Sequence, residues 1–421
     1  MFEKRILKNG ITALHVPLQS TKAATVLVLF KAGSRYETKN INGIAHFVEH
    51  LMFKGTKKRP STLDISKALD KYGAEYNAFT SKDHTGYYIK IDAEHFVEAM
   101  DILFDMLTNS KLEQKEIDRE RKVIFEEIKM YHENPLMHID DLFEQTLFEG
   151  STLGWNIAGD QESMSKITRQ DIVKFIKDYY CPSRTFITVA GNVDQSVFKD
   201  MEKGLGRLRE PKQVARTWSP CLTDGHQRLG LQFKELEQTQ LMLGFPAYHY
   251  GDQRNYALSI LHAILGGTMS SRLFIAVREK RGLAYSVRTQ MGSYEDTGVF
   301  AVHAGLDVAR LPQALKIIRT ELERVVKSGI TTRELVEAKS AIKGRIVLQL
   351  EESSDLAGWY GKQQIFLDQL ETPEERFNKL QKVTQADVLR VAREVIKPAR
   401  MAAAVIGPFK DEKKLRQYLF A

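Results

Sequence analysis

The 421-residue sequence contains an internal duplication, so its fold must include one domain built twice. Residues of the first half recur in the second half at a constant offset of 216 positions. The recurring pairs are Thr168/Thr384, Asp171/Asp387, Pro182/Pro398, Arg184/Arg400 and Gly191/Gly407. A period this long indicates a duplicated domain and not a solenoid, whose repeats are much shorter.

The duplication predicts two domains of the same fold. We expect them at residues 1–210 and 230–421, here called the N-terminal and the C-terminal copy, with a linker at 211–229 that mixes proline, glycine and polar residues. Each copy opens with apolar strands, at residues 24–31 and 238–245, and continues with helices and further strands. This order favours the α+β class, in which each domain has a mainly antiparallel sheet with helices packed on one face.

The composition is that of a globular protein. Apolar residues make up 43% of the chain and charged residues 27%, and no apolar run is long enough to span a membrane. The first 16 residues resemble two strands around an Asn9-Gly10 turn and not a signal peptide. The net charge is +7, but basic and acidic residues alternate, so we expect no nucleic-acid partner. Cys181 and Cys221 are too few for a disulfide framework, which favours a cytoplasmic location.

His46-Phe47-Val48-Glu49-His50 places two histidines and a carboxylate within five residues. On a helix, His46 and His50 lie one turn apart on one face, so both rings can bind one Zn²⁺ ion. Glu49 points to the same side and can act as a general base toward a water molecule. The order H-x-x-E-H is the inverted form of the zinc-peptidase motif.

The C-terminal copy does not repeat this motif. At the 216-residue offset, His46 pairs with His262, but the next two motif positions are occupied by Leu265 and Gly266. We therefore predict no metal site in the C-terminal copy. The Gly266-Gly267 pair lacks the spacing of a P-loop or a dinucleotide-binding loop, so it is only weak support for phosphate binding.

A catalytic zinc ion usually has three protein ligands, and we expect the third from a helix over residues 113–131. Glu126 and Glu127 are adjacent candidates on this helix. Glu120 and Glu127 are two turns apart and share one face. We therefore favour Glu127 as the ligand, Glu120 as a supporting carboxylate that hydrogen-bonds a ligand histidine, and Glu126 as a solvent-facing residue.

The segment Gly43–Thr56 closely resembles the signature of the pitrilysin/insulinase family (M16) of zinc peptidases, which includes mitochondrial processing peptidase. The resemblance extends over essentially the whole chain. Family members carry the third ligand 77 residues after the second histidine, which is Glu127 here, and Glu120 matches their supporting acid. The resemblance implies one Zn²⁺ per chain, with Glu49 as the general base.

The resemblance also implies substrate-binding residues outside the metal site. Asn77 and Ala78 match the segment by which the family presents a strand edge to a peptide, so that the substrate extends a sheet. Arg278 and Tyr285, in the C-terminal copy, match a pair that reaches the substrate and stabilises the developing oxyanion. Without the family, these four residues would fit an ordinary strand and surface as well or better.

Together, these features predict a zinc metalloendopeptidase that cleaves peptides or unfolded protein segments. The alternative is a non-catalytic partner or scaffold subunit, although such chains typically lose part of the metal motif. Two-domain members resemble half of a larger clamshell, so we expect a homodimer, and we expect no membrane partner. The ligand types alone do not exclude another divalent metal.

Overall fold

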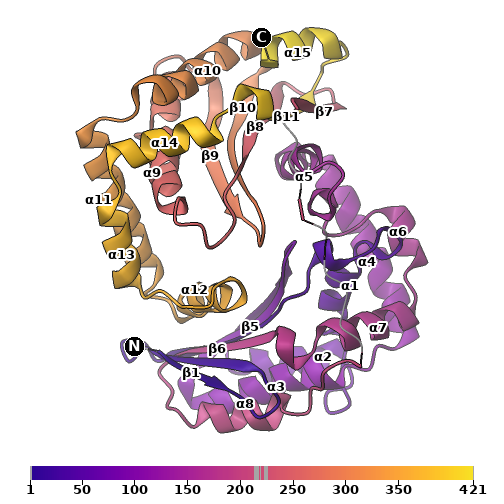
Figure 1. Ribbon diagram of the computed structural model, residues 1–421. Helices are drawn as coiled ribbons and strands as arrows, with labels where there is room; N and C mark the ends of the chain where they lie inside the picture. Colours follow the sequence, from indigo (N-terminus) through magenta and orange to yellow (C-terminus); the bar gives the residue numbers. More distant parts are fainter. Residues whose placement is uncertain (1, 213–217, 219, 222–225, 421) are drawn as a thin grey trace. The chain divides into compact units, whose positions relative to one another are not determined.

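The computed structural model describes residues 2–212, 218, 220–221 and 226–420. The chain divides into two compact units, each made of three segments. Unit 1 comprises Met1–Lys129, Trp155–Trp218 and Val347–Thr372, and unit 2 comprises Met130–Gly154, Ser219–Ile346 and Pro373–Ala421. Each unit therefore contains sequence from both copies (Figure 1).

Unit 1 contains a six-stranded sheet in the order β1-β2-β6-β3-β5-β4. β2 and β6 are parallel, and the other neighbouring strands are antiparallel. The strands are β1 Glu3–Ile6, β2 Thr12–Pro17, β3 Ala23–Phe30, β4 Glu75–Thr80, β5 Thr85–Asp92 and β6 Thr185–Gly191. β4 is an edge strand, because in the part of the chain that the structure describes it pairs only with β5.

Helices cover both faces of this sheet. Val26 and Val28 of β3 pack into the core that contains α3, whereas Leu27 and Leu29 pack against α12 on the opposite face. Alternate residues of a strand point to opposite faces, which explains why β3 is apolar throughout. The helices of unit 1 are α1 Ile44–Leu51, α2 Thr62–Asp70, α3 Phe96–Asn109, most of α4 Gln114–Glu133, α6 Gln161–Lys166, α7 Arg169–Tyr179, α8 Val197–Leu205 and α12 Ser353–Phe366.

Unit 2 contains a five-stranded sheet in the order β7-β11-β8-β10-β9. Its strands are β7 Arg228–Phe233, β8 Gln238–Ala247, β9 Ala284–Ser293, β10 Gly298–Asp307 and β11 Ala402–Gly407. Its helices are α5 Pro135–Leu147, α9 Asn255–Leu265, α10 Leu311–Ser328, most of α11 Thr332–Gln349, α13 Pro373–Lys382, α14 Gln385–Val395 and α15 Glu412–Phe420. A π-helical segment, η6, spans Phe274–Glu279.

The two sheets share one topology. The order β2-β6-β3-β5-β4 corresponds to β7-β11-β8-β10-β9, with the same parallel pair and the same antiparallel pairs. Thr168/Asp171 and Thr384/Asp387, which recur in the sequence, form the capping boxes that begin α7 and α14. The predicted α+β class with two homologous domains is confirmed. The expectation of helices on only one face is wrong, because α12 and α5 cover the second faces of the two sheets.

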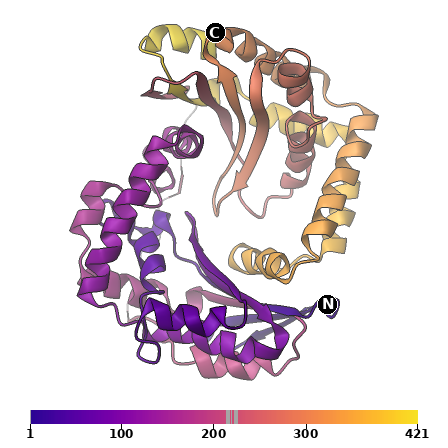
Figure 2. The ribbon, with the colours of Figure 1, turned by 180° about the vertical axis from the view of Figure 1, so that it is seen from behind.

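The two copies exchange one helix each. α5 comes from the N-terminal copy but lies beside the sheet of unit 2 (Figure 1 and Figure 2). Its Ile139 and Phe143 pack with Met242 and Ala404 of that sheet. α12 comes from the C-terminal copy and covers the unit 1 sheet. The compact units therefore differ from the continuous ranges 1–210 and 230–421, which stay a prediction for the duplicated copies.

The predicted linker at 211–229 lies partly outside the described residues, which omit 213–217, 219 and 222–225. Within it, the ring of Trp218 stacks on the buried Arg35 guanidinium, with 3.6 Å between the Arg35 Cζ atom and the ring centroid. This contact belongs to unit 1, whose second segment ends at Trp218.

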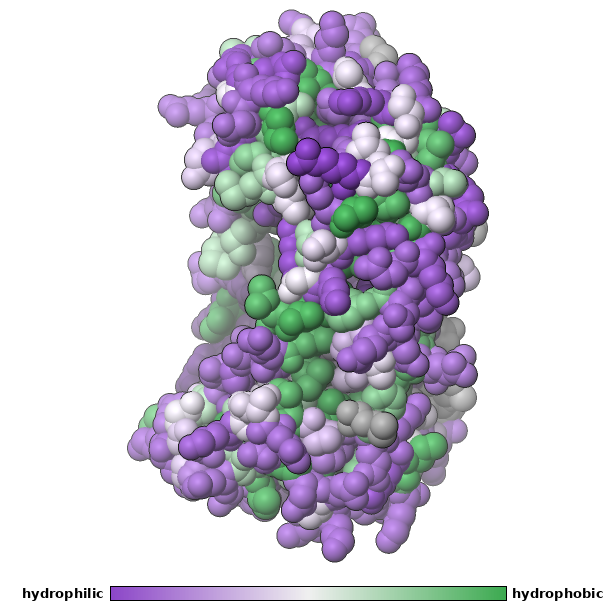
Figure 3. All heavy atoms as spheres, turned by 90° about the vertical axis from the view of Figure 1, so that its left-hand side faces the viewer, coloured by the Kyte–Doolittle hydropathy of each residue, from purple (hydrophilic) through white to green (hydrophobic). Residues whose placement is uncertain are grey.

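The surface drawn in Figure 3 is mostly hydrophilic, with apolar residues in groups between the charged ones. The exposed apolar residues include Val336, Val347 and Leu348 of α11. Among the helices that the structure describes, none combines the length and the apolar character needed to cross a lipid bilayer.

Candidate metal centre

α1 carries the predicted zinc motif, and its first turn is fixed by two features. Gly43 precedes the helix with φ +97°, and a side chain there would lie 2.6 Å from the carbonyl oxygen of Ala158, so glycine is required. The carboxyl group of buried Glu37 accepts hydrogen bonds of 2.8 Å from the amides of Gly43 and Ala45. Burial raises the pKa of Glu37 to about 8, although the hydrogen bonds from these amides, which carry the partial positive charge of a helix N-terminus, oppose the shift.

The two sides of α1 differ in polarity. The residues buried in the core of unit 1 are Ile44, Ala45, Phe47, Val48 and Leu51. His46, Glu49 and His50 are half-buried on the other side of the helix. The i, i+3 and i+4 spacing of a helix therefore brings the three functional groups of the motif to one face.

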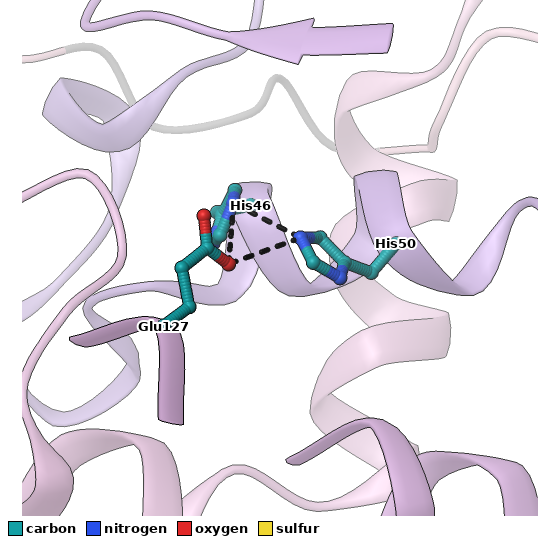
Figure 4. A group of neighbouring side chains, drawn as sticks. All are labelled: His46, His50 and Glu127. Atoms are coloured by element: carbon teal, nitrogen blue, oxygen red, sulfur yellow. Dashed lines mark hydrogen bonds and ion pairs between the residues drawn. The ribbon is translucent and has the colours of Figure 1, made fainter. Parts of the chain in front are cut away.

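Glu127 of α4 completes a group of three possible ligands (Figure 4). The Nε2 atoms of His46 and His50 are 3.1 Å apart, and the Oε2 atom of Glu127 lies 3.8 Å from the first and 3.5 Å from the second. Zinc bonds to nitrogen and oxygen are about 2.0–2.1 Å long, so tetrahedral ligand atoms lie roughly 3.3 Å apart. The three residues therefore fit a zinc ion, whereas the neighbouring Glu126 side chain is 73% exposed and pairs with Lys129.

The two imidazoles differ in their electrostatics. Burial, assisted by the neighbouring His50, lowers the pKa of His46 to about 3, so this ring is neutral at pH 7, as a metal ligand must be. Burial also opposes charge on His50, but the hydrogen bond to Glu120 and the carboxylates nearby outweigh it and raise the pKa of His50. His50 uses its Nδ1 atom for Glu120 at 2.9 Å, which leaves Nε2 to face Glu127.

Glu120 lies where a supporting carboxylate is expected, and both of its oxygens have partners. It is 4% exposed; its Oε1 atom accepts the hydrogen bond from His50, and its Oε2 atom pairs with the Lys54 ammonium at 2.7 Å. Burial raises the pKa of this carboxyl group, but the hydrogen bonds from His50 and Lys54 outweigh burial and lower it. Glu120 is therefore ionised at neutral pH and can fix the orientation of the His50 ring.

Glu49 is held by a residue of the neighbouring sheet. The Thr80 hydroxyl, at the end of β4, donates a 2.7 Å hydrogen bond to the Oε2 atom of Glu49. Burial raises the pKa of Glu49, and the Thr80 hydrogen bond and the His50 charge oppose this shift. A carboxylate with a raised pKa is a stronger base and so suits proton transfer near neutral pH.

Asn77 and Ala78 lie in the middle of β4, an edge strand of the unit 1 sheet. Asn77 is exposed, and its Oδ1 atom accepts a 2.9 Å hydrogen bond from the amide of Ala78. β4 also packs beside α1. The segment predicted to receive a peptide therefore has an open edge and adjoins the helix of the zinc motif.

Arg278 and Tyr285 lie in unit 2, at the end of η6 and near the start of β9. The Arg278 guanidinium lies 5.7 Å from the centroid of the Tyr285 ring, and Tyr285 is 74% exposed. The structure thus brings the two residues together within unit 2. Their role toward the substrate stays a prediction.

Sequence comparisons place these residues in a known family. Residues 15–161 match the family described as Insulinase (Peptidase family M16), and residues 166–342 match the one described as Peptidase M16 inactive domain. The uncharacterized zinc protease YmxG of Bacillus subtilis is 36% identical over 408 residues, which are 97% of this chain and 98% of that protein. The chain belongs to peptidase family M16.

Other M16 relatives are similar over at least nine tenths of their length. An uncharacterized zinc protease of Streptomyces coelicolor is 37% identical over 417 residues, covering 97% of this chain and 90% of that protein. A protease from Helicobacter pylori has a solved structure with a TM-score of 0.91 and 28% identity, covering 97% of this chain and 99% of that one. These relatives support a peptidase that uses zinc.

The match to the M16 inactive domain agrees with the loss of ligands in the C-terminal copy. His262 of α9 occupies the counterpart of the first ligand position, and its Nδ1 atom lies 2.8 Å from the hydroxyl of Thr289 on β9. Leu265 and Gly266 occupy the other two motif positions. Among the described residues of unit 2, no histidine, cysteine and carboxylate side chains form a group that could hold a metal ion.

Three residues with contacts to α1 or to the supporting Glu120 were not anticipated from the sequence. Lys54 lies beyond the end of α1, and its partner Glu120 is on α4, so helix spacing does not predict this contact. The sequence gave no indication of the contacts of Glu37 and Thr80 either. Their contacts with α1 depend on how a loop and a strand pack against the helix, and that packing has no counterpart in local sequence spacing.

Proposed function

We propose that this M16 chain is a zinc-dependent endopeptidase that hydrolyses peptides or unfolded protein segments. The main support is the geometry of three possible ligand atoms, which lie 3.1–3.8 Å apart: Nε2 of His46, Nε2 of His50 and Oε2 of Glu127. Glu127 reaches from α4 toward the face of α1 that bears the two histidines and Glu49. A zinc ion held by these atoms would polarise the scissile carbonyl of the substrate and lower the pKa of a bound water molecule.

The side chains of the chain itself have separate tasks in this proposal. Glu49 takes a proton from the attacking water and returns it to the nitrogen of the leaving amine. The substrate binds in extended form along β4 at Asn77 and Ala78, where main-chain hydrogen bonds accept many sequences. Arg278 and Tyr285 stabilise negative charge on the scissile carbonyl oxygen.

The decisive experiment combines metal analysis with cleavage of an unfolded, internally quenched fluorescent peptide. Wild type is expected to bind about one zinc per chain and to cleave. Glu49→Gln should keep zinc and lose activity, and Glu127→Gln should lose both. Glu126→Gln, the adjacent exposed residue, is the control and should behave as wild type. Cleavage by zinc-loaded Glu49→Gln would contradict the mechanism, and zinc without activity in wild type would favour a non-catalytic subunit.

Measurement of zinc affinity also tests whether Lys54 contributes to metal binding through its ion pair with Glu120. Lys54→Met removes the ammonium that pairs with Glu120 but keeps a side chain of similar length. Because outer hydrogen-bond partners of zinc ligands typically contribute 10–100-fold in affinity, we expect about tenfold weaker zinc binding in chelator competition. Lys57→Met, at an exposed position three residues later, should leave zinc affinity unchanged.

We further propose that the protein acts as a homodimer in the cytoplasm. Support comes from the M16 resemblance and from the composition and cysteine content of the chain. Sedimentation velocity should give twice the chain mass at the concentrations used for assays. A fully active monomer would contradict the dimer.

A further inference from the structure

Thr80 joins the strand proposed to bind peptide to the residue proposed to take the proton. Along β4, Tyr76 and Ala78 pack toward the core of unit 1, and Thr80 continues the same two-residue period. Its hydroxyl donates to the Oε2 atom of Glu49 at 2.7 Å. One hydrogen bond therefore connects the edge strand of the sheet to the working carboxylate on α1.

The C-terminal copy contains the counterpart of this link. Gly73-Ala74-Glu75-Tyr76 aligns with Gly282-Leu283-Ala284-Tyr285, and the same register places Thr80 opposite Thr289. Thr289 lies on β9, an edge strand of the unit 2 sheet, and its hydroxyl lies 2.8 Å from the Nδ1 atom of His262 on α9.

In both units, a threonine at the sixth position of the strand thus joins β4 or β9 to a helix that precedes it in the sequence, α1 or α9. Only the partner differs. In unit 2 it is the histidine that remains from the metal motif, and in unit 1 it is the general base. The comparison helps to separate two possible roles of Thr80, because the contribution of such a link to fold stability should be similar in both units, whereas positioning of Glu49 concerns unit 1 alone.

We propose that Thr80 is a positioning residue that fixes the carboxylate of Glu49 and couples it to peptide binding along β4. The proposal rests on the endopeptidase function proposed above. A glutamate side chain has three rotatable bonds, and a hydrogen bond to one oxygen restricts them while leaving the other oxygen for the water molecule. A peptide that pairs with β4 orders the strand from which Thr80 projects, so long substrates should gain in kcat as well as in binding.

The test uses Thr80→Val, Thr80→Ser and the matched control Thr289→Val, all loaded with zinc. Two quenched peptides share one cleavage site, but the shorter one lacks the residues that would extend along β4. For the long peptide, Thr80→Val should lower kcat about tenfold or more, change KM less than about threefold and leave zinc content unchanged. Thr80→Ser should restore most of kcat, and Thr289→Val should leave kcat unchanged.

The ratio of kcat between the long and the short peptide gives a second readout. It should fall in Thr80→Val toward one, because the loss of the hydroxyl disconnects the strand from the base. Equal kcat for Thr80→Val and Thr289→Val, or loss of zinc from Thr80→Val, would overturn the positioning role. If wild type with bound zinc cleaves neither peptide, the proposed endopeptidase function is wrong, and so is the role proposed for Thr80.

Discussion

Glu49 and Glu120 are chemically identical groups on neighbouring helices, and their surroundings shift their pKa values in opposite directions. For both, burial is the largest influence and raises the pKa. Glu120 overcomes it because His50 and Lys54 both donate hydrogen bonds to its carboxylate. Glu49 receives a hydrogen bond from the neutral Thr80 hydroxyl, and its pKa stays raised. The difference suits Glu120 to permanent charge and Glu49 to proton exchange.

His84 gives a pH-dependent prediction that does not depend on the metal. Burial, followed by the Lys362 charge, lowers its pKa from 6.5 to about 3 in the folded state. Between these values the unfolded chain binds a proton that the folded chain does not, so stability falls as the pH decreases through this window. At pH 5 the loss attributable to His84 is about 2 kcal/mol relative to pH 7.5.

Urea unfolding in the presence of a chelator measures this contribution. His84→Asn removes the titrating ring, so the variant should lose less stability than wild type between pH 7.5 and pH 5, whatever its absolute stability. His249→Asn, which changes an exposed histidine, should show the same dependence of unfolding free energy on pH as wild type. If the unfolding free energies of wild type and His84→Asn changed equally with pH, His84 would accept a proton as readily in the folded protein as in the unfolded chain.

Helices and strands with strong periodicity were predictable from the sequence. The elements against which they pack were not. The predicted strands at 24–31 and 238–245 correspond to β3 and β8, and the predicted helix at 113–131 corresponds to α4. These elements carry continuous apolar runs or a helical period. The sequence contains no comparable indication that α12 covers the unit 1 sheet, because the apolar face of a helix does not specify which of two similar sheets it will cover.

The contact of α12 with its sheet depends on Gly361. A Cβ atom there would lie 2.9 Å from Leu29 Cδ1 and 3.0 Å from Leu27 Cδ2, whereas a Cβ atom at Gly358 of the same helix would meet nothing within 4 Å. Gly358→Ala should stabilise the protein by about 0.5–1 kcal/mol through helix propensity. Gly361→Ala should be about 1–3 kcal/mol less stable than Gly358→Ala, because the added methyl group overpacks the interface.

Urea unfolding midpoints of the two alanine variants check this prediction, and each variant is the control for the other. If both were stabilised equally, the helix would not lie as close to β3 as the structure has it. This pair therefore tests the placement of α12 without reference to any activity.

The exchange of α5 and α12 makes each unit depend on both ends of the chain. Residues 1–212 expressed alone would lack α12, which leaves Leu14, Leu27 and Leu29 uncovered, and would carry α5 without its sheet. We expect this fragment to aggregate or to bind hydrophobic dyes. Adding residues 226–421 should restore a folded complex.

A chain with a protease site inserted in the predicted linker provides the control. After folding and cleavage, the two fragments should remain associated, because each unit then already contains its exchanged helix. A fragment of residues 1–212 that folds alone, with a sharp unfolding transition and no dye binding, would contradict the exchange.

The exchange also determines when the protein can fold in the cell. The ribosome releases the last strand of the unit 1 sheet, β6, long before it releases α12, which ends at Phe366. At about 5–20 residues per second, that interval is on the order of ten seconds or more, during which one face of the nascent sheet has no cover. Unit 1 is therefore completed late in synthesis, and the exposed face of its sheet is where a chaperone would bind the growing chain.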